Sequence, residues 1–166
     1  MTEQTASDKL QKQALQFLEE TFETHHGIYL DKGTAFFETL GGMSAEEASQ
    51  RAIDTTASIA AHVRHVVFYL EVIQRSIRGE ELGKLNWREI WENDKPVSSE
   101  AWTAQVDALR AEYAKVLEML SDPATWERED VLGEFMAIAV HSAYHLGAIR
   151  QALAVIRSRG GSRTGR

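Results

Sequence analysis

Apolar residues recur at three- and four-residue steps in four long segments of the chain, and this spacing is typical of amphipathic helices. The only two prolines, Pro96 and Pro123, fall where the periodicity breaks. No segment shows the alternation typical of a strand. The pattern therefore predicts an all-α protein whose long helices cover about residues 7–24, 58–77, 99–120 and 131–157.

Four long helices without strands predict a four-helix bundle. We expect residues 1–157 to form one bundle domain and residues 158–166, which include several Gly and Ser, to be a flexible tail. The predicted first helix has an apolar face and a charged face, and Glu20 falls on the charged one. The predicted fourth helix is apolar on most sides, which indicates burial on most sides or packing against a second subunit.

Two connections separate these helices. The first is long, covers about residues 25–56, and contains four glycines that favour turns. Ser44 and Glu47 within it have the spacing of a capping box and predict a short helix. The second connection, Leu85–Val97, is polar but contains Trp87 and Trp91, whose position at a pocket mouth or in the core stays open.

Composition narrows the class of protein. The 166 residues are 43% hydrophobic and 26% charged, as in ordinary globular domains, and the formal net charge is −7. An acidic chain argues against nucleic-acid binding, which depends on Lys and Arg. No apolar run is long enough for a membrane span, and the N-terminus lacks the features of a secretory signal. We therefore expect a cytoplasmic protein without nucleic-acid or membrane partners.

The absence of cysteine limits the chemistry of the protein. With no thiol in the chain, disulfides, thiolate metal ligands and a cysteine nucleophile are excluded. A metal site in this protein must use His, Asp, Glu or water.

Four of the six histidines lie inside apolar helix segments. His141 and His145 are four residues apart, so their side chains share one face of the predicted fourth helix. Ile138 and Ile149 lie on the same face, which therefore points into the bundle. Two imidazoles one turn apart can bind the same ion, as in helical zinc sites. On their own, however, the two histidines are also explained as buried polar residues that hydrogen-bond to neighbours.

The predicted second helix carries another pair, His62 and His65, beside its buried stripe. One further imidazole from this helix would complete a three-histidine site with a position open for water or substrate. Sites with this open position are catalytic rather than structural.

Other polar and aromatic residues are weaker candidates. His25 precedes His26 and Gly27 and is expected near the end of the first helix. Glu134 lies two turns before His141 and is a candidate base or a candidate acceptor for a hydrogen bond from a metal-bound histidine, although a first-turn Glu is also favoured by the helix dipole. Tyr144 and Arg150 flank the pair and are typical of packing or interface residues.

Two stretches resemble a known family. The segment His141–Gln151, HSAYHLGAIRQ, resembles the motif H-x-x-x-H-x-G-Q-I in the last long helix of the DinB/YfiT-like superfamily. The segment 58–66, SIAAHVRHV, resembles the second helix of that family, which donates the remaining histidine. Ala148 stands in place of the usual Gln, which removes a polar group near the expected site.

The resemblance implies an up-down-down-up four-helix bundle with a three-histidine site for a divalent metal ion, zinc or nickel, and a homodimer. It implies that His141, His145 and one second-helix histidine bind the metal. His65 best matches the family position, whereas the helical wheel places His62 nearer the centre of the apolar stripe, so His62 stays the alternative ligand or a hydrogen-bond partner of a ligand.

Members of the family include thiol-dependent enzymes. The resemblance therefore implies a metal-dependent transferase or hydrolase that acts on a small-molecule substrate and uses a low-molecular-weight thiol or water. The sequence leaves two alternatives open, a non-catalytic small-molecule-binding protein and a purely structural dimeric bundle.

Overall fold

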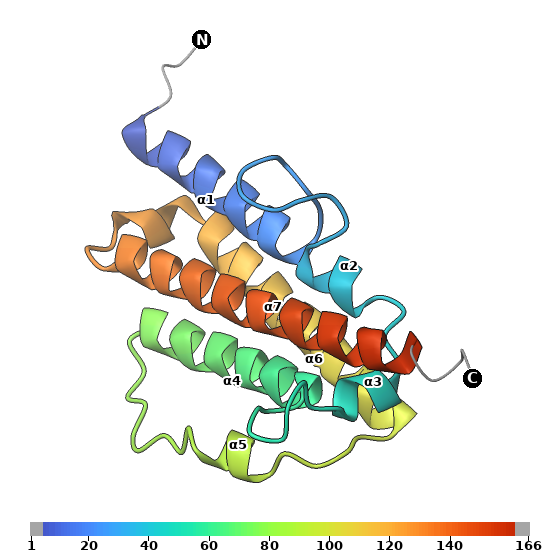
Figure 1. Cartoon of the computed structure of the whole chain (residues 1–166). Coiled ribbons are helices and arrows are strands. Elements are labelled where there is room, and N and C mark those ends of the chain that lie inside the picture. The colour runs from blue at the N-terminus through green and yellow to red at the C-terminus, as the bar shows by residue number, and fades with distance from the viewer. Residues whose placement is uncertain (1–4, 162–166) are drawn as a thin grey trace.

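The computed structural model describes residues 5–161, and these residues form an all-helical protein (Figure 1). Four long helices contain most of the chain. They are α1 (Ala6–Phe22), α4 (Ile59–Ile77), α6 (Ser99–Ser121) and α7 (Val131–Gly161). Within the described range no β-strand is present, and no helix has both the length and the apolar character that a bilayer crossing requires.

Side-chain caps set the starts of the long helices. Thr5 and Asp8 form a capping box at α1, the Ser58 hydroxyl accepts from the Ala61 N–H at α4, and the Ser98 hydroxyl accepts from the Ala101 N–H at α6. These bonds satisfy backbone donors that a helix leaves free in its first turn. The observed helices therefore begin within one residue of the predicted positions.

The end of α7 lies further along than the sequence pattern indicated. This helix continues through Gly161, four residues beyond the predicted end at Arg157. The remaining part of the predicted tail, 162–166, lies outside the described residues.

Three short helices and one 3-10 helix occupy the connections. The capped short helix predicted at Ser44 is confirmed as α3 (Ala45–Ser49), whereas α2 (Phe36–Leu40), α5 (Glu89–Glu92) and η1 (Pro123–Glu127) were not predicted. Two phenylalanines of α2, Phe36 and Phe37, are buried against Phe22 of α1. The first connection therefore adds apolar residues to the core.

The long helices pack in a closely connected set. Both α6 and α7 contact α1 and α4, and α7 lies between α1 and α4 in Figure 1 with α6 behind it. The core between them is apolar, and fully buried members include Leu18, Ile59, Leu70, Leu109, Ile138 and Ile149. The α4–α7 contact is the one that positions the histidines.

One sequence expectation was wrong. Glu20 does not lie on a solvated face of α1 but is completely buried. Its carboxylate accepts hydrogen bonds from four backbone N–H groups of the following connection, those of His26, Ile28, Tyr29 and Leu30. The charge is satisfied by these donors, so burial on the helix side that faces the connection is tolerated.

Candidate metal centre

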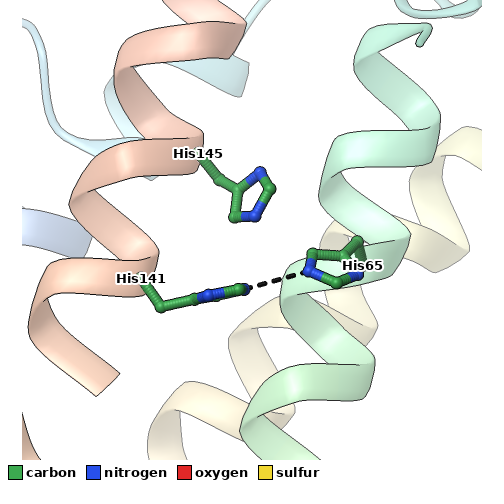
Figure 2. Close-up of side chains that lie close together, drawn as sticks. All are labelled: His65, His141 and His145. Carbon is green, nitrogen blue, oxygen red and sulfur yellow. Dashed lines mark hydrogen bonds between the residues drawn. The ribbon is translucent and has the colours of Figure 1, made fainter. Parts of the chain in front are cut away.

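Three histidines converge between the middle of α4 and the middle of α7. His65 comes from α4, and His141 and His145 come from α7 (Figure 2). Each ring offers one nitrogen, and the three nitrogens all lie within 4.8 Å of one another. His65 and His145 are 7% and 4% exposed, and His141 is half-buried. The cluster is therefore a largely enclosed group of nitrogen donors.

The helical period explains how the chain builds this cluster. His141 and His145 are one turn apart, so their rings lie on the same side of α7 with centroids 4.5 Å apart. Buried aliphatic residues before and after them, Ile138 and Ile149, hold that side of α7 in the core. The packing of α7 against α4 then places His65 opposite the pair.

The closest approach in the cluster joins His65 and His141. Their Nε2 atoms are 3.1 Å apart. Two imidazole nitrogens bound to one tetrahedral ion at about 2.0–2.1 Å lie about 3.3–3.4 Å apart. The pair is thus within a few tenths of an ångström of the separation that a shared ion requires.

Burial keeps these imidazoles neutral. Burial, reinforced by the neighbouring His65, lowers the pKa of His141 to about 4. Burial lowers the pKa of His145 to about 3, with further contributions from His141, His65 and His62. The pKa of His65 is lowered mainly by burial as well. Near neutral pH the rings therefore keep the unprotonated nitrogens that a metal ion needs.

The donor set fits a borderline divalent ion. The three grouped residues are all imidazoles, which suit zinc, nickel or copper better than magnesium or calcium. The Nδ1 atom of His65 is buried and has no hydrogen-bond partner among the described residues. Three neutral nitrogens in an enclosed site are compatible with metal binding, and a four-coordinate ion held by them would take one further ligand.

His62 lies beside the cluster and outside the three-nitrogen group. Its Nδ1 atom is 2.9 Å from Nδ1 of His145, and its side chain is half-buried. Burial lowers the pKa of His62, and the negative charge of Asp94 opposes this effect. The structure thus brings all four histidines of α4 and α7 together, with His65 in the converging set and His62 behind His145.

Aromatic side chains surround the histidines. Tyr69 is stacked on His141 with ring centroids 3.7 Å apart. The ring centroid of Trp91 lies 4.7 Å from that of His65, and Trp91 also contacts His62. The ring centroid of Trp87 lies 6.0 Å from that of His65, and the Trp87 side chain is partly exposed. Sequence reasoning left both tryptophans open and missed Tyr69. The signal for Tyr69 was its position one helical turn after His65.

The tryptophans reach the site because the α4–α6 connection folds back along α4. The Arg64 guanidinium donates to the carbonyls of Ile90 and Asn93. Asp94 accepts from the backbone N–H of Ser58 at the start of α4 and forms an ion pair with Arg51. These contacts fix the segment that carries Trp91 over the histidines.

A pocket of about 540 Å³ lies between α4 and this connection. Arg64, Phe68, Lys84 and Asn86 are among its lining residues. Phe68 also contacts Trp87, with centroids 5.1 Å apart. Trp87 therefore contacts both His65 and a residue that lines the pocket.

The weaker candidates from the sequence do not belong to the group formed by His65, His141 and His145. His25 is in the connection after α1, and Arg150 lies about two and a half turns after His141 on α7. Glu134 is in the first turn of α7, where the helix dipole favours it, and its buried Oε2 has no hydrogen-bond partner within residues 5–161. Tyr144 is 69% exposed and places its ring edge-on to His145.

The remaining tryptophans have structural positions. Trp102 and Trp126 are buried, and their indole N–H groups donate to the backbone carbonyls of Met43 and Leu120. Both side chains belong to the hydrophobic core.

Comparison with known proteins gives a family match that covers the residues of this site. The model of the DinB superfamily matches residues 31–149, which include all three grouped histidines. No curated protein and no solved structure matches the chain.

Proposed function

The chain belongs to the DinB superfamily, and from this premise we propose that it is a metal-dependent transferase or hydrolase. His65, His141 and His145 would hold one zinc or nickel ion. The observation that carries the proposal is the convergence of one nitrogen from each of these three neutral imidazoles. When bound, the ion would supply Lewis acidity that lowers the pKa of a thiol or of water.

The protein's own residues would bind, orient and enclose the reactants. Tyr69 and Trp91 cover neighbouring histidine rings and limit the access of bulk water. The chain has no cysteine, so a reacting thiol must be a substrate. We propose a low-molecular-weight thiol as cosubstrate and a cytoplasmic location, where such thiols are kept reduced.

The substrate would enter beside the tryptophans. The pocket next to Trp87 is lined by the cationic side chains of Arg64 and Lys84, by the acidic Glu89 and by the apolar Phe68. These groups suit a small molecule with a charged part and an apolar part. Trp87 contacts both Phe68 of this pocket and His65, so its indole would contact a substrate that reaches the centre.

We also propose the up-down-down-up bundle topology and a homodimer. The topology is supported by the contacts of α6 and α7 with both α1 and α4, and by chain directions in Figure 1, where α1 and α7 run opposite to α4 and α6. The homodimer is supported by a stripe of exposed apolar residues along α7. Leu132, Met136, Val140 and Tyr144 recur in it at four-residue steps.

Metal content is the first test of the proposed function. Purified untagged protein is incubated with zinc or nickel, dialysed, and analysed for metal per chain. We expect about one ion per chain in the wild type and loss of the ion in His141→Ala and His145→Ala. His25→Ala is the matched control, because this histidine lies outside the site, and it should keep the ion. Wild-type protein without metal would favour the non-catalytic binding or structural alternatives.

Turnover separates an enzyme from a binding protein. Metal-loaded protein is mixed with a small thiol and an electrophile, and consumption of the thiol is followed. The transferase reading predicts turnover that is lost on chelation and in His145→Ala. If a metal-loaded protein turns over neither this pair nor a panel of hydrolase substrates, the binding-protein alternative is favoured.

A further inference from the structure

His62 lies within hydrogen-bond distance of one residue of the candidate centre, His145. It lies one turn before His65 on α4, and its ring centroid is 5.2 Å from that of His145. The two Nδ1 atoms are 2.9 Å apart, which is hydrogen-bond distance. His62 is not part of the group of converging nitrogens, so its contact with His145 needs another explanation than direct ligation.

The proton in this contact determines which nitrogen of His145 is free. Between two neutral imidazoles, one nitrogen must carry the proton and the other must accept it. With His62 as the acceptor, Nδ1 of His145 carries the proton and Nε2 of His145 keeps its lone pair. A metal-binding histidine has this arrangement when its second nitrogen donates to a neighbouring acceptor.

The surroundings of His62 hold its ring in place. Trp91 packs edge-on against it with centroids 5.4 Å apart. The segment that carries Trp91 is tied to α4 through Arg64, whose guanidinium bonds to the carbonyls of Ile90 and Asn93. Because the ring is supported in this way, its Nδ1 is held at a fixed position beside Nδ1 of His145.

His145 differs in this respect from His65. The Nδ1 atom of His65 is buried without a hydrogen-bond partner among the described residues, whereas Nδ1 of His145 has His62. An outer imidazole of this kind raises the basicity of the ligand and fixes its orientation.

We propose that His62 is a positioning residue that accepts a hydrogen bond from Nδ1 of His145 and thereby presents Nε2 of His145 to the metal ion. This inference rests on the proposed metal site. It assigns to His62 a role that is distinct from that of a ligand. It also predicts that any hydrogen-bond acceptor at this position is sufficient to present Nε2 of His145 to the ion.

Two substitutions separate the acceptor from the ring. In His62→Asn the side-chain oxygen can occupy the place of Nδ1 and accept the same bond, whereas in His62→Leu the acceptor is lost. Glu71→Leu, at an exposed position of the same helix, is the matched control. Zinc affinity is measured by competition with a chromogenic chelator, and folding by the thermal melt followed by circular dichroism.

We expect zinc to bind His62→Leu about 10- to 100-fold more weakly than the wild type, still at one ion per chain. His62→Asn should recover most of the affinity, and Glu71→Leu should match the wild type. Equal affinity of His62→Leu and wild type would overturn the inference. Loss of the ion in both folded His62 variants would also overturn it, because His62 would then be a ligand.

The tautomer of His145 gives a readout that needs no metal. Long-range ¹H–¹⁵N correlation spectra of the metal-free protein should show the proton of His145 on Nδ1 in the wild type and in His62→Asn, but not predominantly there in His62→Leu. An unchanged tautomer in His62→Leu contradicts the inference alone. Wild-type protein that binds neither zinc nor nickel contradicts the proposed function, and the positioning role with it, so the two failures are distinct.

Discussion

Tyr69 lies flat on His141, with ring centroids 3.7 Å apart and planes 12° from parallel. The two residues come from α4 and α7, so the stack joins the two helices that carry the candidate metal centre. It fixes the plane of the His141 ring without using either of its nitrogens. The direction in which Nε2 of His141 points toward His65 therefore depends on Tyr69.

Removal of the aromatic ring at Tyr69 should weaken metal binding. Aromatic pairs contribute about 0.5–1.5 kcal/mol beyond their buried area, which corresponds to about a 2- to 12-fold change in an equilibrium constant. We expect zinc affinity to fall by about this factor in Tyr69→Leu and to change little in Tyr69→Phe, which keeps the stack. Equal affinities of Tyr69→Leu and Tyr69→Phe in a chelator competition would contradict the orienting role.

Trp91 should report on binding of nickel. Its ring is 4.7 Å from His65, and a nickel ion quenches the fluorescence of an indole at such short range. We expect quenching in the wild type when nickel is added, and loss of a large part of it in Trp91→Phe. Trp126→Phe is the control, because Trp126 is a core residue that hydrogen-bonds to Leu120. Identical quenching in Trp91→Phe and wild type would place the bound ion elsewhere.

The long helices could be predicted because their sequence signals are local. Ser58 and Ser98 supply caps, and apolar periodicity over several turns defines the faces of α4 and α6. The five residues of α2 are too few for a period to emerge. The burial of Glu20 depends on how the segment after α1 folds back, and neither charge nor the helical wheel contains that information.

The candidate site was predictable to a similar extent. The four-residue spacing of His141 and His145 placed both rings on one face, and the structure has them there. The choice between His62 and His65 could not be made from spacing alone. Three residues correspond to a rotation of about 300°, so the two side chains lie only about 60° apart around α4 and both turn toward α7. Their different positions follow from the register between α4 and α7, which is a property of the packed core.

Glu20 should make the stability of the protein depend on pH at the acidic end. Burial alone raises the pKa of its carboxyl, but the backbone N–H groups of Leu30, Tyr29, Ile28 and His26 outweigh burial and lower the pKa to about 2. In the unfolded chain the pKa is the ordinary 4.5. The folded state therefore binds fewer protons, so the stabilisation is complete above about pH 4.5 and is lost as the pH falls toward 2.

The Glu20→Gln variant tests this dependence. At pH 7 we expect its free energy of unfolding to be lower by about 2–3 kcal/mol, because hydrogen bonds to a buried charged acceptor are lost. The difference from wild type should shrink as the pH is lowered from 4.5, measured by urea unfolding at each pH. Glu46→Gln is the control at an exposed position of α3. A difference that stays constant down to pH 2.5 would contradict a charged Glu20 in the folded state.

The apolar stripe on α7 predicts the effect of a charge on assembly. Val140 and Tyr144 are 64% and 69% exposed in the single chain, and two copies related by a two-fold axis would cover these residues on each other. We expect the wild-type protein to have twice the chain mass of 18.7 kDa in light scattering, and Val140→Glu to be monomeric and folded. Gln151→Glu, at another exposed position of α7, should remain dimeric. A monomeric wild type, or a Val140→Glu variant with the mass of a dimer, would exclude this face as the contact between two copies. Because Tyr144 also contacts His145, a dimer formed here would have each candidate metal centre next to the interface.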